Sequence, residues 1–129
     1  KQAVQDIFYA GYCGDKKSQE AIRAVWENHR YLCDTHTATA WAVAEDYVSS
    51  TGDNRPMVVL STASAYKFPA AVLNSLEAVA ETDDFRLLDM LKAKTGVNIP
   101  RNLTGLEEKA ELHTNVIEKA DMISFVMER

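Results

Sequence analysis

The sequence between residues 38 and 48 has helical spacing and carries apolar side chains on nearly all of its sides. Its apolar residues are Ala38, Ala40, Trp41, Ala42, Val43, Ala44, Tyr47 and Val48. A helix with this pattern is typical of a buried position, because each side must be covered by other parts of the protein. The chain has 129 residues, which is little material for such a cover. We therefore expect residues 1–129 to form a single incomplete domain of a larger protein.

The first residues of the chain favour the same interpretation. Residues 1–4, KQAV, contain no initiator Met and no signal-peptide pattern. We expect the chain to be a fragment or a processed piece.

Capping residues predict further helices. Asp, Thr and Asn favour the N-cap, Pro favours the first turn, and Gly favours the position after the last turn. In chain order these signals are Asp15, Asp34 or Thr35, Pro69, Asp83 or Asp84 with Gly96 at the end, and Thr114 or Asn115. Residues 1–9 have the pattern of the end of a preceding helix.

A short apolar run predicts a strand. Residues 56–61, PMVVLS, are rich in β-branched side chains, which is typical of a buried parallel strand. Residues 112–113 fit a short edge strand. Because a sheet needs several strands, we expect a mostly helical α/β fold with one or two strands of a larger sheet. The other strands would then lie outside this chain.

Composition excludes several classes of function. The formal net charge is −5 and the chain has no basic cluster, which argues against binding to nucleic acid or to an anionic membrane. No apolar run reaches the roughly 18 residues that a membrane span needs. Cys33, Asp34 and His36 are close in sequence, but no second pair of ligands supports a metal site. Free thiols in a reducing, cytoplasmic compartment are the expected state of the two cysteines.

The segment 58–69 is the first candidate for chemistry. The hydroxyls of Ser61, Thr62 and Ser64 follow the predicted strand, and Lys67 precedes a helix start. Ligands of open α/β sheets bind at the carboxyl ends of strands, and a helix N-terminus favours negative charge. These residues suit an anionic or heteroaromatic ligand. The alternative is that the hydroxyls make local turn hydrogen bonds and that Lys67 is solvated.

Asp34 and His36 are the second candidate. An Asp and a His two residues apart can act as an acid/base pair. The alternative is that Asp34 caps a helix and that His36 lies in the first turn of this helix. The sequence has no Gly-x-Ser-x-Gly elbow and no Gly-rich phosphate loop.

Two segments resemble motifs of the threonine synthase family. Residues 60–69, LSTASAYKFP, resemble a motif in which Ser/Thr-Thr-Ala precedes His/Ser-Pro-x-Lys-Phe, although Ala65 stands where Pro is usual. Residues 34–41, DTHTATAW, resemble the acidic-x-His-(Thr/Ala)-Ala start of a helix. The upstream Gly11-Tyr12 and the downstream residues 96–100, GVNIP, extend the resemblance along nearly the whole chain.

The resemblance implies the fold and the chemistry of tryptophan-synthase-β-like enzymes that use pyridoxal phosphate. Threonine synthase converts O-phospho-L-homoserine and water to L-threonine and phosphate. The Schiff-base Lys and the Gly/Asn-rich phosphate loop of the family precede the part that matches here, so this chain alone should be inactive. By motif position, Thr62 would bond the pyridine nitrogen. Lys67, Ser64, Asp34 and His36 would contact substrate or form a wall of the pocket.

Two other functions fit the same residues. A threonine-synthase-like phospholyase that releases 2-oxobutyrate would share these motifs. A non-catalytic interaction module is also compatible with the sequence. The expected partners are the small-molecule substrate and the rest of the same polypeptide, and self-association would be a further way to cover the apolar helix.

Overall fold

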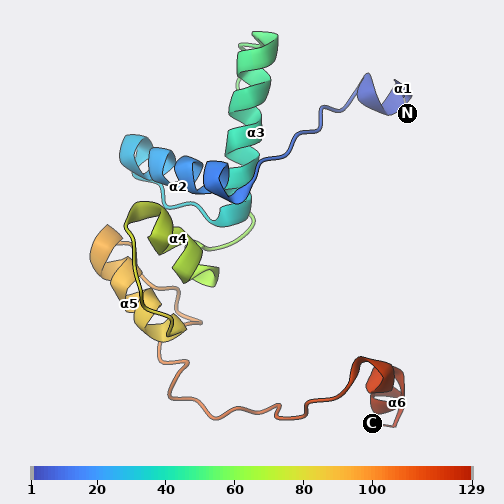
Figure 1. Cartoon of the computed structure of the whole chain (residues 1–129), viewed down its shortest axis with the longest axis vertical. Coiled ribbons are helices and arrows are strands. Elements are labelled where there is room, and N and C mark those ends of the chain that lie inside the picture. Colours follow the sequence, from blue (N-terminus) through green and yellow to red (C-terminus); the bar gives the residue numbers. More distant parts are fainter. Residues whose placement is uncertain (1, 129) are drawn as a thin grey trace.

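Four helices form the body of the molecule, and an extended arm leads away from it at each end (Figure 1). The computed structural model describes residues 2–128. The body contains α2 (Asp15–His29), α3 (Thr35–Thr51), α4 (Pro69–Leu76) and α5 (Asp84–Thr95), with a short 3-10 helix, η1 (Ala65–Lys67), before α4. The N-terminal arm carries α1 (Gln2–Gln5). The C-terminal arm ends in a 3-10 helix, η2 (Lys119–Asp121), and α6 (Met122–Met127).

The core lies where the four helices of the body meet. Helix α2 packs against α3 and α4, and α4 also packs against α5. Contacts among apolar side chains in this arrangement remove them from water, which is the main stabilising contribution to such a fold. The buried apolar residues are Ala21, Ile22, Val25, Cys33, Ala38, Ala42, Ala65, Tyr66, Val72, Leu73, Leu87, Leu88 and Leu91.

The predicted boundaries at Asp34, Pro69, Asp83 and Gly96 are confirmed, whereas the N-cap of α2 is Gly14 and the predicted cap Asp15 is its first helical residue. Asp34 is the N-cap of α3, and Asp83 is the N-cap of α5, where its side chain accepts a hydrogen bond from the Arg86 N–H at 2.9 Å. Pro69 occupies the first turn of α4, where its missing N–H costs no hydrogen bond. Helix α5 ends at Gly96, whose φ of 73° is left-handed.

The expected strands are absent from residues 2–128, and the α/β prediction is wrong. Residues 56–61 form an extended connection without strand pairing, and residues 112–113 are also irregular. A strand forms only when a neighbouring strand accepts and donates its backbone hydrogen bonds, and the described residues provide no such neighbour. Apolar β-branched residues therefore predict where a strand can form, and they do not supply its partner.

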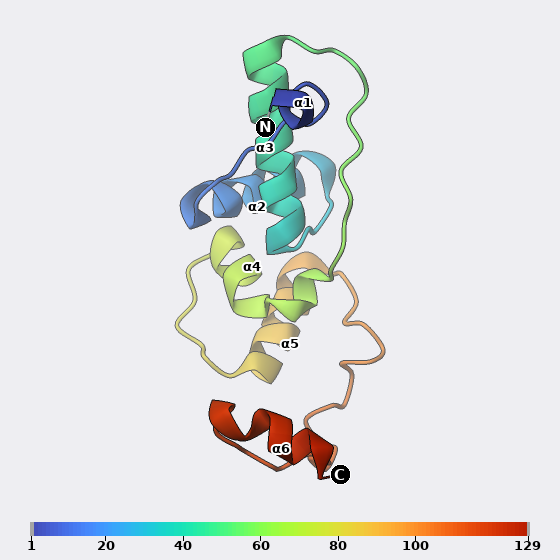
Figure 2. The same cartoon turned by 90° about the vertical axis from the view of Figure 1, so that its right-hand side faces the viewer.

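Helix α3 is less covered than its apolar pattern predicts. Its buried residues within the described structure are Thr37, Ala38 and Ala42, all in the first half of the helix. The second half extends beyond the body, and the connection from Gly52 onward runs back alongside it (Figure 2). The described residues thus cover the start of α3 and leave its end largely open.

The two ends of the chain differ in part from their predicted helices. The first predicted helix covered residues 1–9, of which Lys1 lies outside the described residues, and α1 ends at Gln5. The last was expected to begin at Thr114 or Asn115, whereas helical structure starts at Lys119. Neither arm contributes a buried residue to the core. Helix formation at short length is marginal without such packing, which accounts for the shortened helices.

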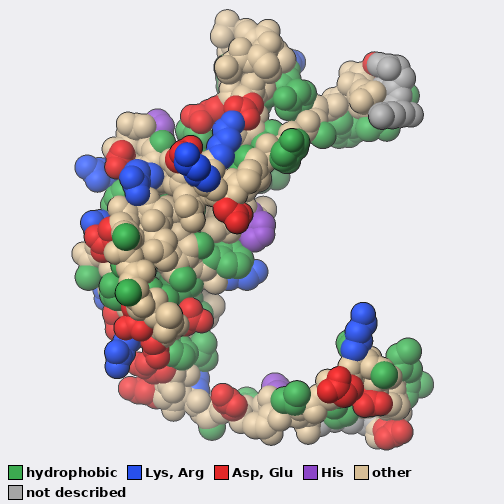
Figure 3. Space-filling view, in the orientation of Figure 1, with side chains coloured by type: hydrophobic (Ala, Val, Ile, Leu, Met, Phe, Trp, Pro, Cys, Tyr) green, Lys and Arg blue, Asp and Glu red, His purple; other side chains and the backbone are tan. Residues whose placement is uncertain are grey.

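Charged side chains of both signs are interspersed over the visible face of the body (Figure 3). No helix among residues 2–128 is long and apolar enough to cross a membrane.

Candidate functional site

Side chains of the connection between α3 and η1 lie against α3 to different degrees. Val59 and Ser61 line a cavity together with residues of α3, whereas Val58 and Leu60, which are 85% and 73% exposed, line a second groove along α3. Successive side chains of an extended backbone point to opposite sides, even when the backbone is not paired. Thr62 follows Ser61 and is exposed.

Thr62 lies on the surface with an available hydroxyl. Its side chain is exposed, and within residues 2–128 its hydroxyl has no hydrogen-bond partner. A Thr hydroxyl can donate one hydrogen and accept two. The Thr62 hydroxyl is thus free to bond an atom that lies outside this chain.

Asp34 is a buried carboxylate at the start of α3. Its Oδ1 accepts a hydrogen bond from the His36 N–H at 2.9 Å and one from the Thr37 N–H at 3.4 Å, and its Oδ2 accepts one from the Thr37 hydroxyl. Burial alone would raise the pKa of Asp34, but these hydrogen bonds outweigh burial and hold the pKa below its usual range. The cap interpretation of Asp34 is therefore confirmed.

Ser61 joins this carboxylate to the connection. The Tyr31 hydroxyl donates to Ser61 Oγ at 2.8 Å, and Ser61 Oγ lies 3.3 Å from Thr37 Oγ1. A cavity of about 110 Å³ lies beside these groups, and Tyr31, Thr37 and Ser61 are among its lining residues. Sequence reasoning did not assign a role to Tyr31 or Thr37. Tyr31 offers no local signal, because its partner is 30 residues away along the chain.

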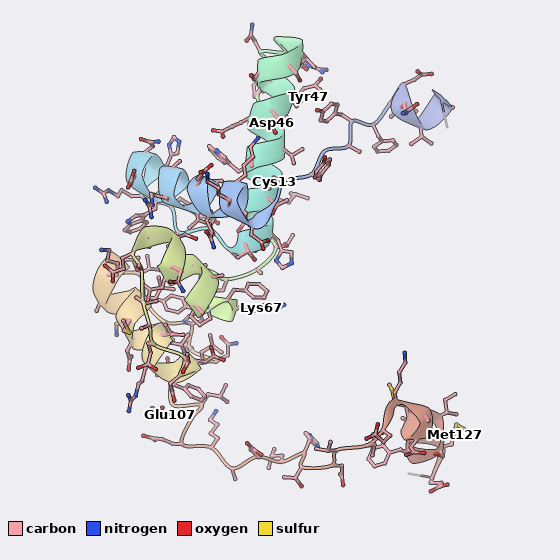
Figure 4. All side chains as sticks on the ribbon, in the orientation of Figure 1. Cys13, Asp46, Tyr47, Lys67, Glu107 and Met127 are labelled. Atoms are coloured by element: carbon pink, nitrogen blue, oxygen red, sulfur yellow. The ribbon has the colours of Figure 1, made fainter. Side chains whose placement is uncertain are left out.

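His36 and Lys67 each contact the ring of Phe68. The His36 ring centroid is 5.3 Å from that of Phe68, and Lys67 Nζ is 5.4 Å from the Phe68 centroid. His36 Nδ1 is also 3.3 Å from Asp34 Oδ1, so His36 is held by the cap in the first turn of α3. Lys67 is exposed at the end of η1, before α4 (Figure 4). It forms no ion pair with another described residue.

Ser64 has a local structural role. Its side chain accepts a hydrogen bond from the Tyr66 N–H at 3.2 Å and caps η1. Tyr66 is buried, and its hydroxyl donates to the Val97 carbonyl at 2.5 Å. Burial raises the pKa of Tyr66, which keeps the phenol neutral. These bonds fix η1 on the body immediately after Thr62.

The described residues contain one group that suits the pyridoxal phosphate implied by the resemblance. Thr62 offers a neutral hydroxyl of the kind that can bond a ring nitrogen. The glycines with positive φ are Gly52, Gly96 and Gly105, which lie far apart in sequence and do not form a Gly-rich phosphate loop. Among residues 2–128, no group of three or more His, Cys, Asp or Glu side chains is arranged to hold a metal ion.

The two cysteines are free thiols. Cys33 is buried beside Asp34, and burial raises its pKa to about 11. A thiol with such a pKa remains protonated at neutral pH and is a poor nucleophile. Cys33 thus belongs to the core.

Comparison with known proteins gives one family and several relatives. The family described as threonine synthase, C-terminal, matches residues 37–126. Proteins named threonine synthase-like 1 from Macaca fascicularis, Homo sapiens and Pongo abelii are 32%, 30% and 29% identical to this chain over 76 residues. The aligned region covers 59% of this chain and 10% of each relative, so the chain spans about a tenth of their length.

Proposed function

The chain belongs to the threonine synthase family, which it matches over the family's C-terminal part, and we propose that it contributes to a pyridoxal-phosphate enzyme. The proposed reaction converts O-phospho-L-homoserine and water to L-threonine and phosphate. The Schiff-base Lys and the phosphate-binding loop would lie in polypeptide outside this chain. On this proposal the chain alone neither holds the cofactor tightly nor turns over substrate.

The proposed role of Thr62 is to hydrogen-bond the pyridine nitrogen of the cofactor. The observation that carries this role is the exposed Thr62 hydroxyl, which lacks a partner within residues 2–128. Ser61 on one side and Ser64 on the other are both engaged in hydrogen bonds, so Thr62 is the available hydroxyl of this loop.

A hydroxyl at this position suits elimination and replacement chemistry. Pyridoxal phosphate, when bound, supplies an electron sink for the carbon atoms of the substrate. A carboxylate beside the ring nitrogen would keep the nitrogen protonated and strengthen this sink. A neutral Thr62 hydroxyl orients the ring without fixing a full positive charge on it.

Lys67 is proposed to contact a phosphate group or an acidic group near the site. Its ammonium is exposed and without an ionic partner among the described residues, which leaves its charge available. Asp34, His36 and Ser64 would shape one wall of the pocket, because their side chains hold the starts of α3 and η1. None of these three needs to transfer a proton in this role.

Substitution of Thr62 tests the proposal in the protein that contains this chain. Thr62→Val keeps the shape and removes the hydroxyl, and Thr62→Ser keeps the hydroxyl. We expect Thr62→Val to shift the absorption bands of bound pyridoxal phosphate and to lower the rate of threonine formation by roughly tenfold or more, whereas Thr62→Ser should retain most of both.

Two results would contradict the proposal. An unchanged spectrum and rate for Thr62→Val would exclude Thr62 as the partner of the ring nitrogen. Formation of 2-oxobutyrate from O-phospho-L-homoserine without threonine would show that the activity is that of a phospholyase and not that of a threonine synthase.

A further inference from the structure

We infer that Tyr31 is a positioning residue: through Ser61 and Thr37 it holds the loop that presents the Thr62 hydroxyl. This inference rests on the function proposed for Thr62. It adds a residue from outside the loop, on the connection between α2 and α3.

Ser61 is the polar anchor of the connection. Within residues 56–63, the hydrogen bonds of the described structure all involve the Ser61 side chain. The connection is otherwise fixed at its two ends, by the turn at Asp53, which accepts hydrogen bonds from Arg55, and by the cap at Ser64. Between these ends, the contact of the Ser61 hydroxyl with Thr37 holds the backbone beside α3.

The three hydroxyls form a directed chain of hydrogen bonds. Thr37 has one hydroxyl hydrogen, and the charged carboxylate of Asp34 accepts it. The hydrogen between Ser61 and Thr37 must therefore come from Ser61, which leaves the Ser61 lone pairs to accept the hydrogen of Tyr31. The order of donation is Tyr31 to Ser61, Ser61 to Thr37, and Thr37 to Asp34.

The Asp34 end of this series of hydrogen bonds is shielded from water. Asp34 and Thr37 are buried, with exposed fractions of 1% and 4%, whereas Tyr31 and Ser61 are exposed. Asp34 is itself fixed by two backbone N–H groups at the start of α3. These hydrogen bonds thus connect an exposed loop to a rigid, charged group in the body. Neighbouring hydrogen bonds of this kind strengthen one another.

The position of Ser61 determines the direction of Thr62. Ser61 lines the cavity beside Thr37, and the exposed Thr62 follows it directly along the extended backbone. A shift of Ser61 away from Thr37 would move or rotate the Thr62 hydroxyl, because consecutive residues share one peptide plane. Loss of the Tyr31 hydroxyl removes one of the two bonds that prevent this shift.

Backbone dynamics of the full chain provide the first measurement. We compare nitrogen-15 relaxation order parameters at the amides of residues 61–63 in the wild type, in Tyr31→Phe and in Ser61→Ala. The wild type should be near the rigid value of about 0.85, and both variants should fall toward the flexible value of about 0.6. The matched control is Tyr12→Phe, because Tyr12 is also exposed and its hydroxyl has no partner among the described residues.

The cofactor provides the second measurement, in the protein that contains this chain. With pyridoxal phosphate bound, Tyr31→Phe should shift the absorption bands in the direction of Thr62→Val and lower kcat roughly two- to tenfold, with a smaller change in KM. A residue with a purely structural role would change the unfolding midpoint and leave these bands in place. Tyr12→Phe should leave the bands, kcat and KM unchanged.

The outcomes separate this inference from the function on which it rests. Order parameters in Tyr31→Phe that equal those of Tyr12→Phe would overturn the positioning role, whatever Thr62→Val does. Absorption bands that move in Thr62→Val and stay in place in Tyr31→Phe would also overturn it. Bands that stay in place in Thr62→Val itself would instead remove the proposed cofactor contact.

Discussion

Asp34 carries a charge in an almost fully buried position, and its hydrogen bonds explain why the fold tolerates it. Three donors from His36 and Thr37 surround the carboxylate. Removal of one partner of a buried charged group is costly, because the remaining partners lose hydrogen bonds that water cannot replace. The residue that sequence reasoning assigned to capping or to catalysis is therefore a stabilising residue of the α3 start.

This role predicts a pH-dependent loss of stability in Asp34→Ala. The pKa of Asp34 lies below its unfolded value, so its contribution is fully present above the unfolded pKa of about 4 and is lost as the pH falls through the folded pKa. We expect Asp34→Ala to lower the free energy of unfolding by about 2 kcal/mol at neutral pH. The difference from wild type should shrink in acid, as measured by urea unfolding across pH.

Asp83→Ala is the matched control for this substitution. Asp83 also caps a helix, but it is exposed and accepts a hydrogen bond from the Arg86 N–H at its cap. We expect Asp83→Ala to cost about 1 kcal/mol. A loss in Asp34→Ala that is no larger than this, or that stays constant as the solution is acidified, would contradict the stabilising role of the buried carboxylate.

At the scale of elements, local chemistry predicts helices well and strands poorly. The bounds of α3 and α5 follow from Asp34, Asp83 and Gly96, whose side chains or backbone act within one turn of their own position. The run 56–61 has the apolar, β-branched composition of a buried strand, but strand pairing depends on a second segment that the described residues do not supply. The strand prediction is therefore wrong because strand pairing depends on residues that are distant in the sequence.

The same distinction applies to the candidate site. Ser64 and Asp34 act on residues two and three positions away, so their capping roles could be predicted from the sequence. The contact of Tyr31 with Ser61 joins two irregular segments on either side of α3. No local pattern of residue types specifies such a contact, because only the fold brings the two residues together.

The end of α5 offers a test at this scale. Gly96 has a left-handed φ of 73°, and its N–H donates to the Lys92 carbonyl at 2.7 Å. We expect Gly96→Ala to destabilise the fold by about 1 kcal/mol, because an added Cβ is strained at this φ. Gly96→Asn should cost less, since Asn tolerates the left-handed region. Thermal unfolding of both variants checks this, and equal losses would show that strain at Gly96 is not the cause.

At the scale of the whole molecule, the chain leaves apolar surface that its own residues do not cover. The outer half of α3 and the connection beside it line a groove of about 430 Å³, which includes Tyr9, Val43, Val58 and Leu60. Apolar surface gathered in a groove marks sites where other polypeptide or a ligand binds. Within residues 2–128, the apolar side chains of the outer half of α3 therefore remain partly uncovered.

This exposed surface predicts that the chain binds a hydrophobic dye. We expect the fluorescence of an anilinonaphthalene dye to rise when it is mixed with the full chain. The double substitution Val58→Lys/Leu60→Lys should reduce this rise several-fold, because both side chains line the groove and the two ammonium groups would replace its apolar surface by charged, hydrated surface. Fluorescence titration at several protein concentrations checks the effect, and a dependence on concentration would reveal self-association through the same surface.

A second double substitution separates the groove from general exposure. Leu112→Lys/Val116→Lys adds the same charge at residues that are 85% and 96% exposed and that lie on the extended C-terminal arm. Isolated apolar side chains on an extended arm offer a dye no enclosed surface, so this variant should retain the wild-type fluorescence. An equal reduction in both variants would mean that net charge controls dye binding. If the wild-type chain does not increase the fluorescence of the dye, the groove is covered. Self-association, or a rearrangement of the connection onto α3, would produce this cover.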